Sequence, residues 1–273
     1  MLAYHYSTIP MTSKHCLNCD NKLTGKYCSN CGQKADTHRI SFKNFILHDV
    51  MHGTLHIEKG ILFTAKQALL RPGKASLEYI AGKRKRYYNV FYLILITIGI
   101  MLFFRHIDEL FNIQQEEIIP ERDYLNEASK KMDEIFSTKS KYLLLLFVPF
   151  TALNSFILFR RKRLNLSEHF ILSGMILLGI LLLGTFANIY FPLNNLLNID
   201  GTIASLVITA IMIIYVCYGY SNAFNGDYSK AGIAYRIVLF FAMLFLELMI
   251  LFVLIYGYVT NWKFGEINIA PFG

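Results

Sequence analysis

Catalytic motifs are absent from this sequence, and so are long apolar runs ahead of about Tyr87. The 273 residues include no GxSxG, no HExxH, no glycine loop that could cradle phosphate and no paired-carboxylate motif within an apolar run. We therefore favour a protein that is not an enzyme. The late start of the first apolar run also leads us to expect no cleavable signal peptide.

Cysteine is scarce, and nearly all of it lies in one short segment. The chain has five cysteines, and Cys217 falls inside an apolar run, where we interpret it as a small buried side chain. No disulfide framework is implied. The other four form two Cys-x-x-Cys pairs separated by eight residues, namely Cys16, Cys19, Cys28 and Cys31.

These two pairs have the spacing of a zinc ribbon. One turn can present both sulfurs of a pair to an ion at about 2.3 Å, and two pairs complete a tetrahedron with no position left for water or substrate. Such a closed site is structural, not catalytic. The alternative, two redox-active pairs, would require a thioredoxin-like βαβ context, which is not present. We predict a structural Zn²⁺ site over residues 14–34 that depends on the metal for folding.

Charge is sparse as well. Only 17% of the residues are charged while 54% are hydrophobic, and the mean hydropathy is +0.39, which argues against a soluble fold. Five apolar runs are long enough to cross a hydrocarbon core of roughly 30 Å. They cover about residues 87–104, 142–159, 170–190, 202–220 and 236–258, and Pro192 follows the third.

The fold class predicted from these features is mainly α. We expect a polytopic helical membrane protein with about five transmembrane helices over residues 87–260, a small N-terminal zinc ribbon and an amphipathic helical connector over residues 35–86. Within the connector, two short segments at about 61–70 and 75–81 should end at Arg71-Pro72-Gly73 and at Gly82, and they suit a membrane interface.

The distribution of charge predicts the orientation. The loop over residues 105–141 has nine acidic and six basic residues, a balance of −3, and should face outward. The positive-inside rule then places the N-terminus in the bacterial cytoplasm and the C-terminus outside the inner membrane. Two basic clusters should contact anionic lipid headgroups: Lys83, Arg84, Lys85, Arg86, Arg160, Arg161, Lys162 and Arg163.

Essentially all of the excess positive charge precedes the first apolar run. Residues 1–86 contain fourteen basic and five acidic residues, a balance of +9, while the whole chain has a formal charge of +8. A basic segment next to a membrane favours anionic lipid as its partner. Nucleic acid is disfavoured as a partner, because no basic stripe interleaved with aromatic residues crosses the two cysteine pairs.

The connector also contains a candidate second site. His48, His52 and His56 recur at intervals of four, so an unbroken helix would place them on one face, with Asp49 beside the first. Such a face could bind a transition metal or relay protons. The alternative is that Gly53 interrupts the helix and the histidines are interfacial side chains.

One ionisable residue lies deep within a predicted span. Glu247 is in the middle of the fifth run, where a carboxyl group costs about 2.5–3.5 kcal/mol and is a functional candidate. Either a hydrogen bond to a neighbour such as Asn154, Asn188 or a tyrosine pins the bundle, or the carboxyl group couples protons or ions. The triplet Ser167-Glu168-His169 is interpreted as a helix-start cap.

Several motifs, in this order, resemble a known family. They are the first Cys-x2-Cys pair, then Lys26-Tyr27-Cys28-x2-Cys31-Gly32-Gln33-Lys34, residues 37–40, Arg71-Pro72-Gly73 and Gly82-Lys83-Arg84. Over about residues 14–95, the chain resembles bacterial membrane proteins of domain-of-unknown-function family 3667. The resemblance implies an N-terminal zinc ribbon and a helical membrane domain, and it supplies no known activity.

Three functional hypotheses follow. We favour an adaptor or assembly factor whose ribbon and basic connector bind a partner protein or anionic lipid at the cytoplasmic face, and a homo-oligomer is compatible with it. The first rival is a transporter or channel-like protein that works through Glu247. The second is a lipid-modifying membrane enzyme that uses His48, His52 and Asp49.

Overall fold

The computed structural model describes residues 14–37, 39–40, 60–112, 127–138, 140–197 and 201–262. Within these ranges the chain is mainly helical and has no strand, only isolated bridges between His15 and Lys22 and between Tyr27 and Lys34. The helices are α2 (Gly60–Leu70), α3 (Pro72–Ile80), α4 (Val90–Asn112), α5 (Glu127–Thr138), α6 (Ser140–Leu158), α7 (Leu166–Leu197), α8 (Gly201–Phe224) and α9 (Lys230–Thr260).

In the part of the chain that the structure describes, three helical segments are long and apolar enough to cross a membrane. They are Leu166–Phe186 in α7, Ile203–Phe224 in α8 and Lys230–Thr260 in α9. The predicted mainly helical membrane architecture is therefore confirmed at this level. The two earlier predicted spans overlap α4 and α6. Within the residues whose side chains the structure describes, the apolar parts of these helices are Val90–Phe104 and Leu146–Leu158, which are shorter. A count of five spans stays a prediction.

Helix α7 is longer than the apolar run that predicted it. It continues past Pro192 to Leu197, whereas the run ends at about residue 190. Proline lacks an amide hydrogen and so removes one helical hydrogen bond, but a helix can continue through it when neighbouring groups satisfy the carbonyl that is freed. Proline after a run of apolar residues is therefore a weak signal for the end of a membrane helix.

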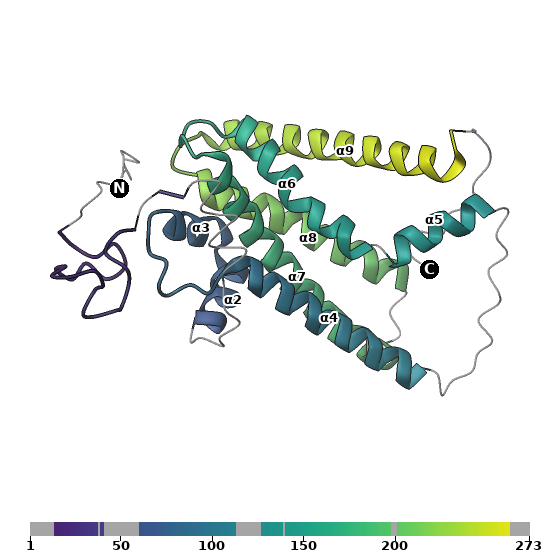
Figure 1. The fold of residues 1–273 in the computed structure, drawn as a ribbon. Helices are drawn as coiled ribbons and strands as arrows, with labels where there is room; N and C mark the ends of the chain where they lie inside the picture. Colours follow the sequence, from purple (N-terminus) through teal and green to yellow (C-terminus); the bar gives the residue numbers. More distant parts are fainter. Residues whose placement is uncertain are drawn as a thin grey trace.

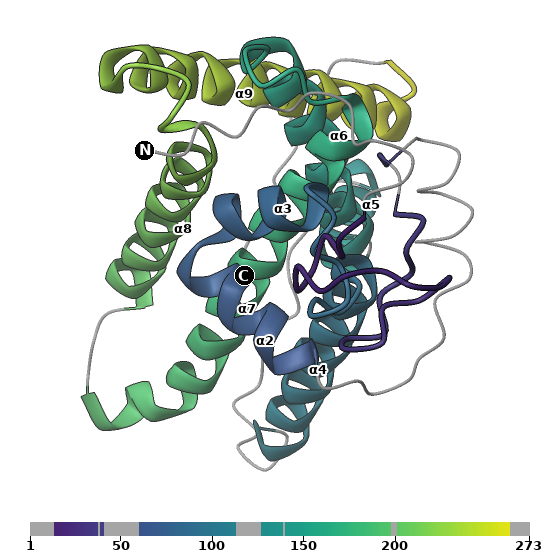
Figure 2. The same ribbon diagram turned by 90° about the vertical axis from the view of Figure 1, so that its left-hand side faces the viewer.

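Helix α7 is the centre of the helical body, a name used here for α4, α6, α7, α8 and α9. Within an 18-residue stretch of its apolar segment 67% of the residues are buried, against 28% in such a stretch of α8 and 6% in one of α9. In Figure 1 the cysteine-rich segment over residues 14–34, called the ribbon below, lies with α2 and α3 at one end of the body. Figure 2 shows this end facing the viewer. Large apolar side chains on α8 and α9, such as Ile214 and Phe245, are exposed, as expected for surfaces that face lipid.

An aromatic cluster holds the helices together at the end where the ribbon lies. The ring of Phe159, just after α6, stacks on Phe224 of α8 with centroids 4.3 Å apart, and it also stacks on Tyr220 at 5.7 Å. All three side chains are at most 1% exposed. Because offset aromatic pairs contribute about 0.5–1.5 kcal/mol beyond their buried area, this cluster fixes α6 against α8.

The Arg71-Pro72-Gly73 motif separates α2 from α3 and packs α3 against the body. Pro72 occupies the first turn of α3, where its missing amide hydrogen costs nothing and its fixed φ favours the helix. A Cβ atom at Gly73 would overlap backbone atoms of Gly219 and Ala223 in α8. The motif therefore starts a new helix and lets its backbone approach α8 directly.

Candidate metal centre

The two cysteine pairs belong to two equivalent knuckles related by a shift of twelve residues. Residues 14–22 read KHCLNCDNK and residues 26–34 read KYCSNCGQK. The backbone hydrogen bonds repeat with the same shift. The amide of Cys16 donates to the carbonyl of Asn21, and the amide of Cys28 donates to the carbonyl of Gln33, each over 2.8 Å. This repeat is visible in the sequence, although the Cys-x-x-Cys spacing alone does not indicate it.

Each knuckle ends in a residue with left-handed backbone. The residue after the second cysteine is Asp20 in the first knuckle and Gly32 in the second, with φ values of 60° and 73°. Aspartate and glycine are among the residues that adopt this conformation most readily. In the second knuckle the amide that follows this turn, that of Gln33, hydrogen-bonds to the sulfur of Cys31. The two knuckles thus share the same backbone turn.

The structure brings the four thiols together into a group that could hold one metal ion. All four Sγ atoms lie within 4.8 Å of one another. The Sγ atoms of Cys16 and Cys31 are 3.6 Å apart, as are those of Cys19 and Cys28. Ligands about 2.3 Å from a tetrahedral ion would be separated by about 3.8 Å. The donor set and its spacing therefore fit a closed four-sulfur site.

The thiols of the cluster are not equivalent as acids. A hydrogen bond from the backbone amide of Cys31 lowers the pKa of the Cys28 thiol to about 6, so this sulfur is a thiolate at neutral pH. Burial raises the pKa of the Cys16 thiol to about 11. A dication between them would favour the thiolate form of both sulfurs. Its positive charge stabilises a thiolate that burial alone would destabilise.

The second knuckle is docked onto the loop between α3 and α4. Gln33, which is 6% exposed, donates from Nε2 to the carbonyl of Gly82 over 2.8 Å. Its Oε1 accepts from the backbone amides of Arg84 and Lys85 over 3.2 Å each. A single side chain thus satisfies three backbone groups of residues 82–85. The equivalent residue of the first knuckle, Asn21, is exposed.

The first knuckle contacts the same loop through Leu17. Gly82 has a φ of +99°, and a Cβ atom there would lie 2.7 Å from Cδ1 of Leu17. Glycine at this position is required both by the backbone conformation and by the approach of the leucine. Two motifs that are about fifty residues apart in the sequence, Gly32-Gln33 and Gly82-Lys83-Arg84, therefore lie against one another.

Residues 39–40 attach the ribbon to the start of α7. The guanidinium group of Arg39 donates from Nε and Nη2 to the two carboxylate oxygens of Glu168 over 2.8 and 2.7 Å. Ile40 is buried in the core, and its carbonyl accepts from Nδ2 of Asn165 over 2.8 Å. Sequence reasoning missed this attachment, because Arg39 and Glu168 have no local pattern in common.

Glu168 also caps α7. Its backbone amide donates to Oδ1 of Asn165 over 2.9 Å, and its carboxylate accepts from the backbone amide of Asn165 over 2.8 Å. This reciprocal pair is a capping box. The interpretation of this segment as a helix start is confirmed, with Asn165 as the capping residue.

The next residue, His169, is buried with Ser155. Its Nδ1 lies 2.7 Å from Oγ of Ser155, and both side chains are at most 1% exposed. Phe156 and Phe224 pack against the imidazole ring. A serine that no substrate can reach is not a nucleophile, and this pair links α6 to α7.

The two basic clusters lie at the end of the body near the ribbon, and several of their members bind protein groups. Arg86 pairs with Glu78 over 2.9 Å, and Lys162 pairs with Asp227 over 2.8 Å. Arg161 donates to the carbonyl of Asp227 over 2.8 Å. The exposed members are Lys85, Arg160, Arg161 and Arg163. Contact with lipid headgroups stays a prediction for all eight.

The other two candidate sites differ in what the structure describes. Asn154 of α6, which is fully buried, donates from Nδ2 to Oε2 of Glu247 in α9 over 2.9 Å, so the expected hydrogen bond to a neighbouring side chain is present. The four connector residues of the second candidate site lie outside the described residues; they are His48, Asp49, His52 and His56.

One comparison with known proteins identifies a related family. Residues 58–102 match the family model described as "Protein of unknown function (DUF3667)", in agreement with the resemblance noted in the motifs. The matched segment covers α2, α3, the loop that receives Gln33 and the first half of α4. Neither the curated proteins nor the solved structures contain a significant match to the chain.

Proposed function

We propose that this chain is a non-enzymatic adaptor or assembly factor of the bacterial inner membrane, whose Zn²⁺ ribbon is held against the cytoplasmic face of a helical membrane domain. The observation that carries the proposal is the docking of Gln33 onto residues 82–85. A closed site that is fixed to the membrane domain can present a surface in a defined orientation, but it offers no coordination position for chemistry.

Zinc is the metal that best fits the cluster. Four cysteine sulfurs in a tetrahedral arrangement are the ligand set of structural zinc sites, and Cys16, Cys19, Cys28 and Cys31 would all be ligands. With so few residues, the ribbon has almost no hydrophobic core of its own. Metal binding would therefore supply much of its folding free energy, and a reducing cytoplasm would keep the thiols available.

The ribbon leaves one surface free for a partner. Leu17 and Gln33 face the helical body, whereas Tyr27 at the start of the second knuckle is 63% exposed. Its neighbour Lys26 and its bridge partner Lys34 are exposed as well. An exposed aromatic ring beside two lysines suits a protein surface that combines apolar and acidic residues. We assign partner binding to this tip.

The geometry gives less support to the two rival functions. Asn154 holds Glu247 in a hydrogen bond between α6 and α9, which is the contact expected of a residue that pins two helices. Neither His48 nor His52 lies in the described residues, so the lipid-modifying enzyme stays a prediction from the sequence.

The proposal is tested by quantitative capture of a partner in intact membranes. The full-length protein is purified in nanodiscs after mild cross-linking, and the associated proteins are quantified by mass spectrometry for the wild type, Tyr27→Ala and His15→Ala. His15 is the counterpart of Tyr27 in the first knuckle, so it provides a matched control. We expect one stoichiometric partner that Tyr27→Ala loses and His15→Ala keeps.

A fourth variant separates the adaptor from the transporter. Glu247→Gln keeps a side chain that can hydrogen-bond to Asn154, so an adaptor should capture its partner as the wild type does. Equal capture by wild type and Tyr27→Ala would refute the assignment of the tip. If Glu247→Gln abolishes the protein's activity in the cell while partner capture stays intact, transport would be favoured instead.

A further inference from the structure

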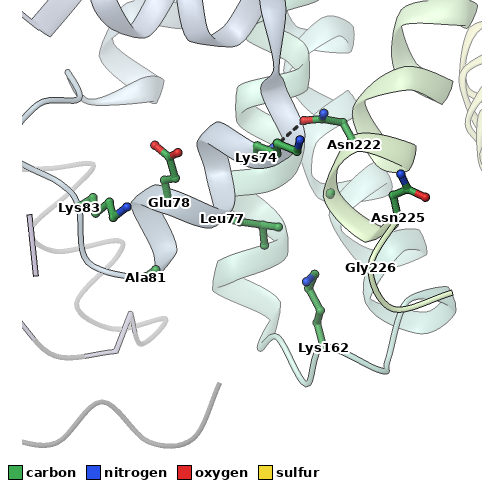
Figure 3. A pocket seen from close by; sticks show the side chains of 10 residues that line it. Lys74, Leu77, Glu78, Ala81, Lys83, Lys162, Asn222, Asn225 and Gly226 are labelled. Atoms are coloured by element: carbon green, nitrogen blue, oxygen red, sulfur yellow. Dashed lines mark hydrogen bonds between the residues drawn. The ribbon is translucent and has the colours of Figure 1, made fainter. Parts of the chain in front are cut away.

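A cavity of about 420 Å³ opens between α3, the end of α8 and the loops that follow α3, α6 and α8. Its lining includes Lys74, Leu77 and Glu78 from α3, Lys83 from the loop after it, Lys162 from the loop after α6, and Asn222 from α8. Figure 3 shows Lys74 and Asn222 together on one side, Lys83 on another, and Lys162 reaching in from the loop below. Its volume lies within the range of small-molecule sites.

The charges around this cavity are unbalanced. Of the lining residues that the structure describes, Glu78 alone is acidic, and it is already paired with Arg71 over 3.2 Å and with Arg86 over 2.9 Å. Lys162 has its own partner in Asp227. Among the residues that the structure describes, Lys74 and Lys83 have no carboxylate partner. The cavity therefore attracts an anion.

The polar groups of the lining are mostly donors. Oδ1 of Asn222 accepts from the backbone amide of Lys74 over 2.8 Å, which orients the amide group and leaves its Nδ2 as a donor. Lysine ammonium groups only donate. Phosphate oxygens only accept, so a phosphate group is the complement of this set.

Part of the lining is apolar, and the position is that of a membrane boundary. Leu77, Ala81 and Ala223 form the apolar part. The cavity lies where the apolar segment Ile203–Phe224 ends. Lys83 and Lys162 belong to the two basic clusters that the positive-inside rule places at the cytoplasmic surface. A phosphate bound here would be at the depth of a lipid headgroup, with apolar surface beside it.

We infer that this cavity binds the headgroup of an anionic phospholipid, with Lys74 and Lys83 as the residues that recognise its phosphate. The inference rests on the membrane placement in the proposed function but not on the adaptor role. A lipid bound between α3 and α8 would connect the matched family segment to the membrane helices. Its headgroup would also lie beside the loop that receives the ribbon.

Native mass spectrometry of the full-length protein tests this site. The protein is released from nanodiscs of phosphatidylcholine that contain increasing amounts of phosphatidylglycerol, and the retained lipid is counted. We expect one phosphatidylglycerol per chain in the wild type. The double variant Lys74→Gln, Lys83→Gln should bind it about tenfold more weakly or worse, because it loses charge-assisted hydrogen bonds.

The matched control is the double variant Lys66→Gln, Lys230→Gln. It removes the same charge from exposed positions on α2 and at the start of α9, and neither residue lines the cavity or belongs to the basic clusters. We expect less than about a twofold change, since a general surface charge does not retain a lipid at fixed stoichiometry. Equal weakening by the two double variants would overturn the inference.

Two further outcomes would also overturn it. Retention of phosphatidylcholine as readily as phosphatidylglycerol would show that the negative charge is not recognised. Displacement of the retained lipid by millimolar inorganic phosphate, with phosphate bound in its place, would show that the site serves a soluble anion. Circular dichroism of each variant checks that the helices are intact. Because no partner protein is present, failure here would leave the adaptor proposal standing.

Discussion

Arg39 and Glu168 form a two-bond ion pair between the segment that follows the ribbon and the first turn of α7, with N to O distances of 2.8 and 2.7 Å. Glu168 is 1% exposed, and its carboxylate also accepts from the amide of Asn165. The same side chain therefore caps a central helix and fastens the ribbon segment to it. Loss of the arginine would leave a buried carboxylate without its cation.

The first prediction concerns this pair. Arg39→Ala should destabilise the protein by roughly 1–3 kcal/mol, the cost of leaving a buried acceptor incompletely satisfied. Arg39→Lys should recover part of the loss, because lysine restores the charge but not the two parallel hydrogen bonds. Thermal unfolding in detergent measures both. In a double-mutant cycle with Glu168→Gln, a coupling energy near zero would contradict the pairing.

The second prediction concerns the metal. Removal of the ion with a chelator, or the variant Cys28→Ser, should unfold residues 14–34 because the ribbon lacks a core of its own. Hydrogen exchange followed by mass spectrometry should show loss of amide protection there, and metal analysis should fall from one zinc per chain to none. Cys217→Ser, which changes the cysteine outside the cluster, should keep both properties. Unchanged protection in a zinc-free preparation would refute the structural role.

The third prediction concerns the docking of the second knuckle. Gln33→Ala should speed hydrogen exchange at the amide of Lys85 at least several-fold, because its acceptor is removed. The effect at Arg84 should be smaller, because that amide also donates to the carbonyl of Gly82 over 2.9 Å. Zinc content should not change. Asn21→Ala, at the equivalent exposed position of the first knuckle, should leave exchange in residues 82–85 as it is in the wild type. Faster exchange in both variants would mean that the loop responds to the ribbon as a whole.

The fourth prediction concerns the packing of α3 on α8. Gly73→Ala should destabilise the protein by about 1–3 kcal/mol, since an added methyl group forces closely packed backbones apart. Gly99→Ala in α4 provides the control, because nothing lies within 4 Å of the Cβ atom that it adds. Alanine also favours a helix over glycine, so the control should be neutral or slightly stabilising. Equal unfolding temperatures for the two variants would contradict the close approach of α3 to α8.

Local patterns in the sequence were enough to predict the apolar helices and the ligand set, but not α5, which lies within the predicted loop over residues 105–141. The spacing of Cys16, Cys19, Cys28 and Cys31 predicts four convergent sulfurs, because each pair lies within one turn. The apolar runs predict α7, α8 and α9, because an apolar run of that length has few alternatives to a membrane helix. The twelve-residue repeat of the knuckles could have been read in the same way.

Only the tertiary structure decided how these elements meet. Gln33 and Asn21 occupy equivalent positions in the repeat, and nothing local shows that the first is buried against residues 82–85 while the second is exposed. Asn154 was one of several partners that the sequence allowed for Glu247. A repeat or an apolar run depends on near neighbours in the chain, whereas these contacts depend on the packing of helices distant in sequence. The four sulfurs were therefore predictable as a cluster, but the surface on which the ribbon rests was not.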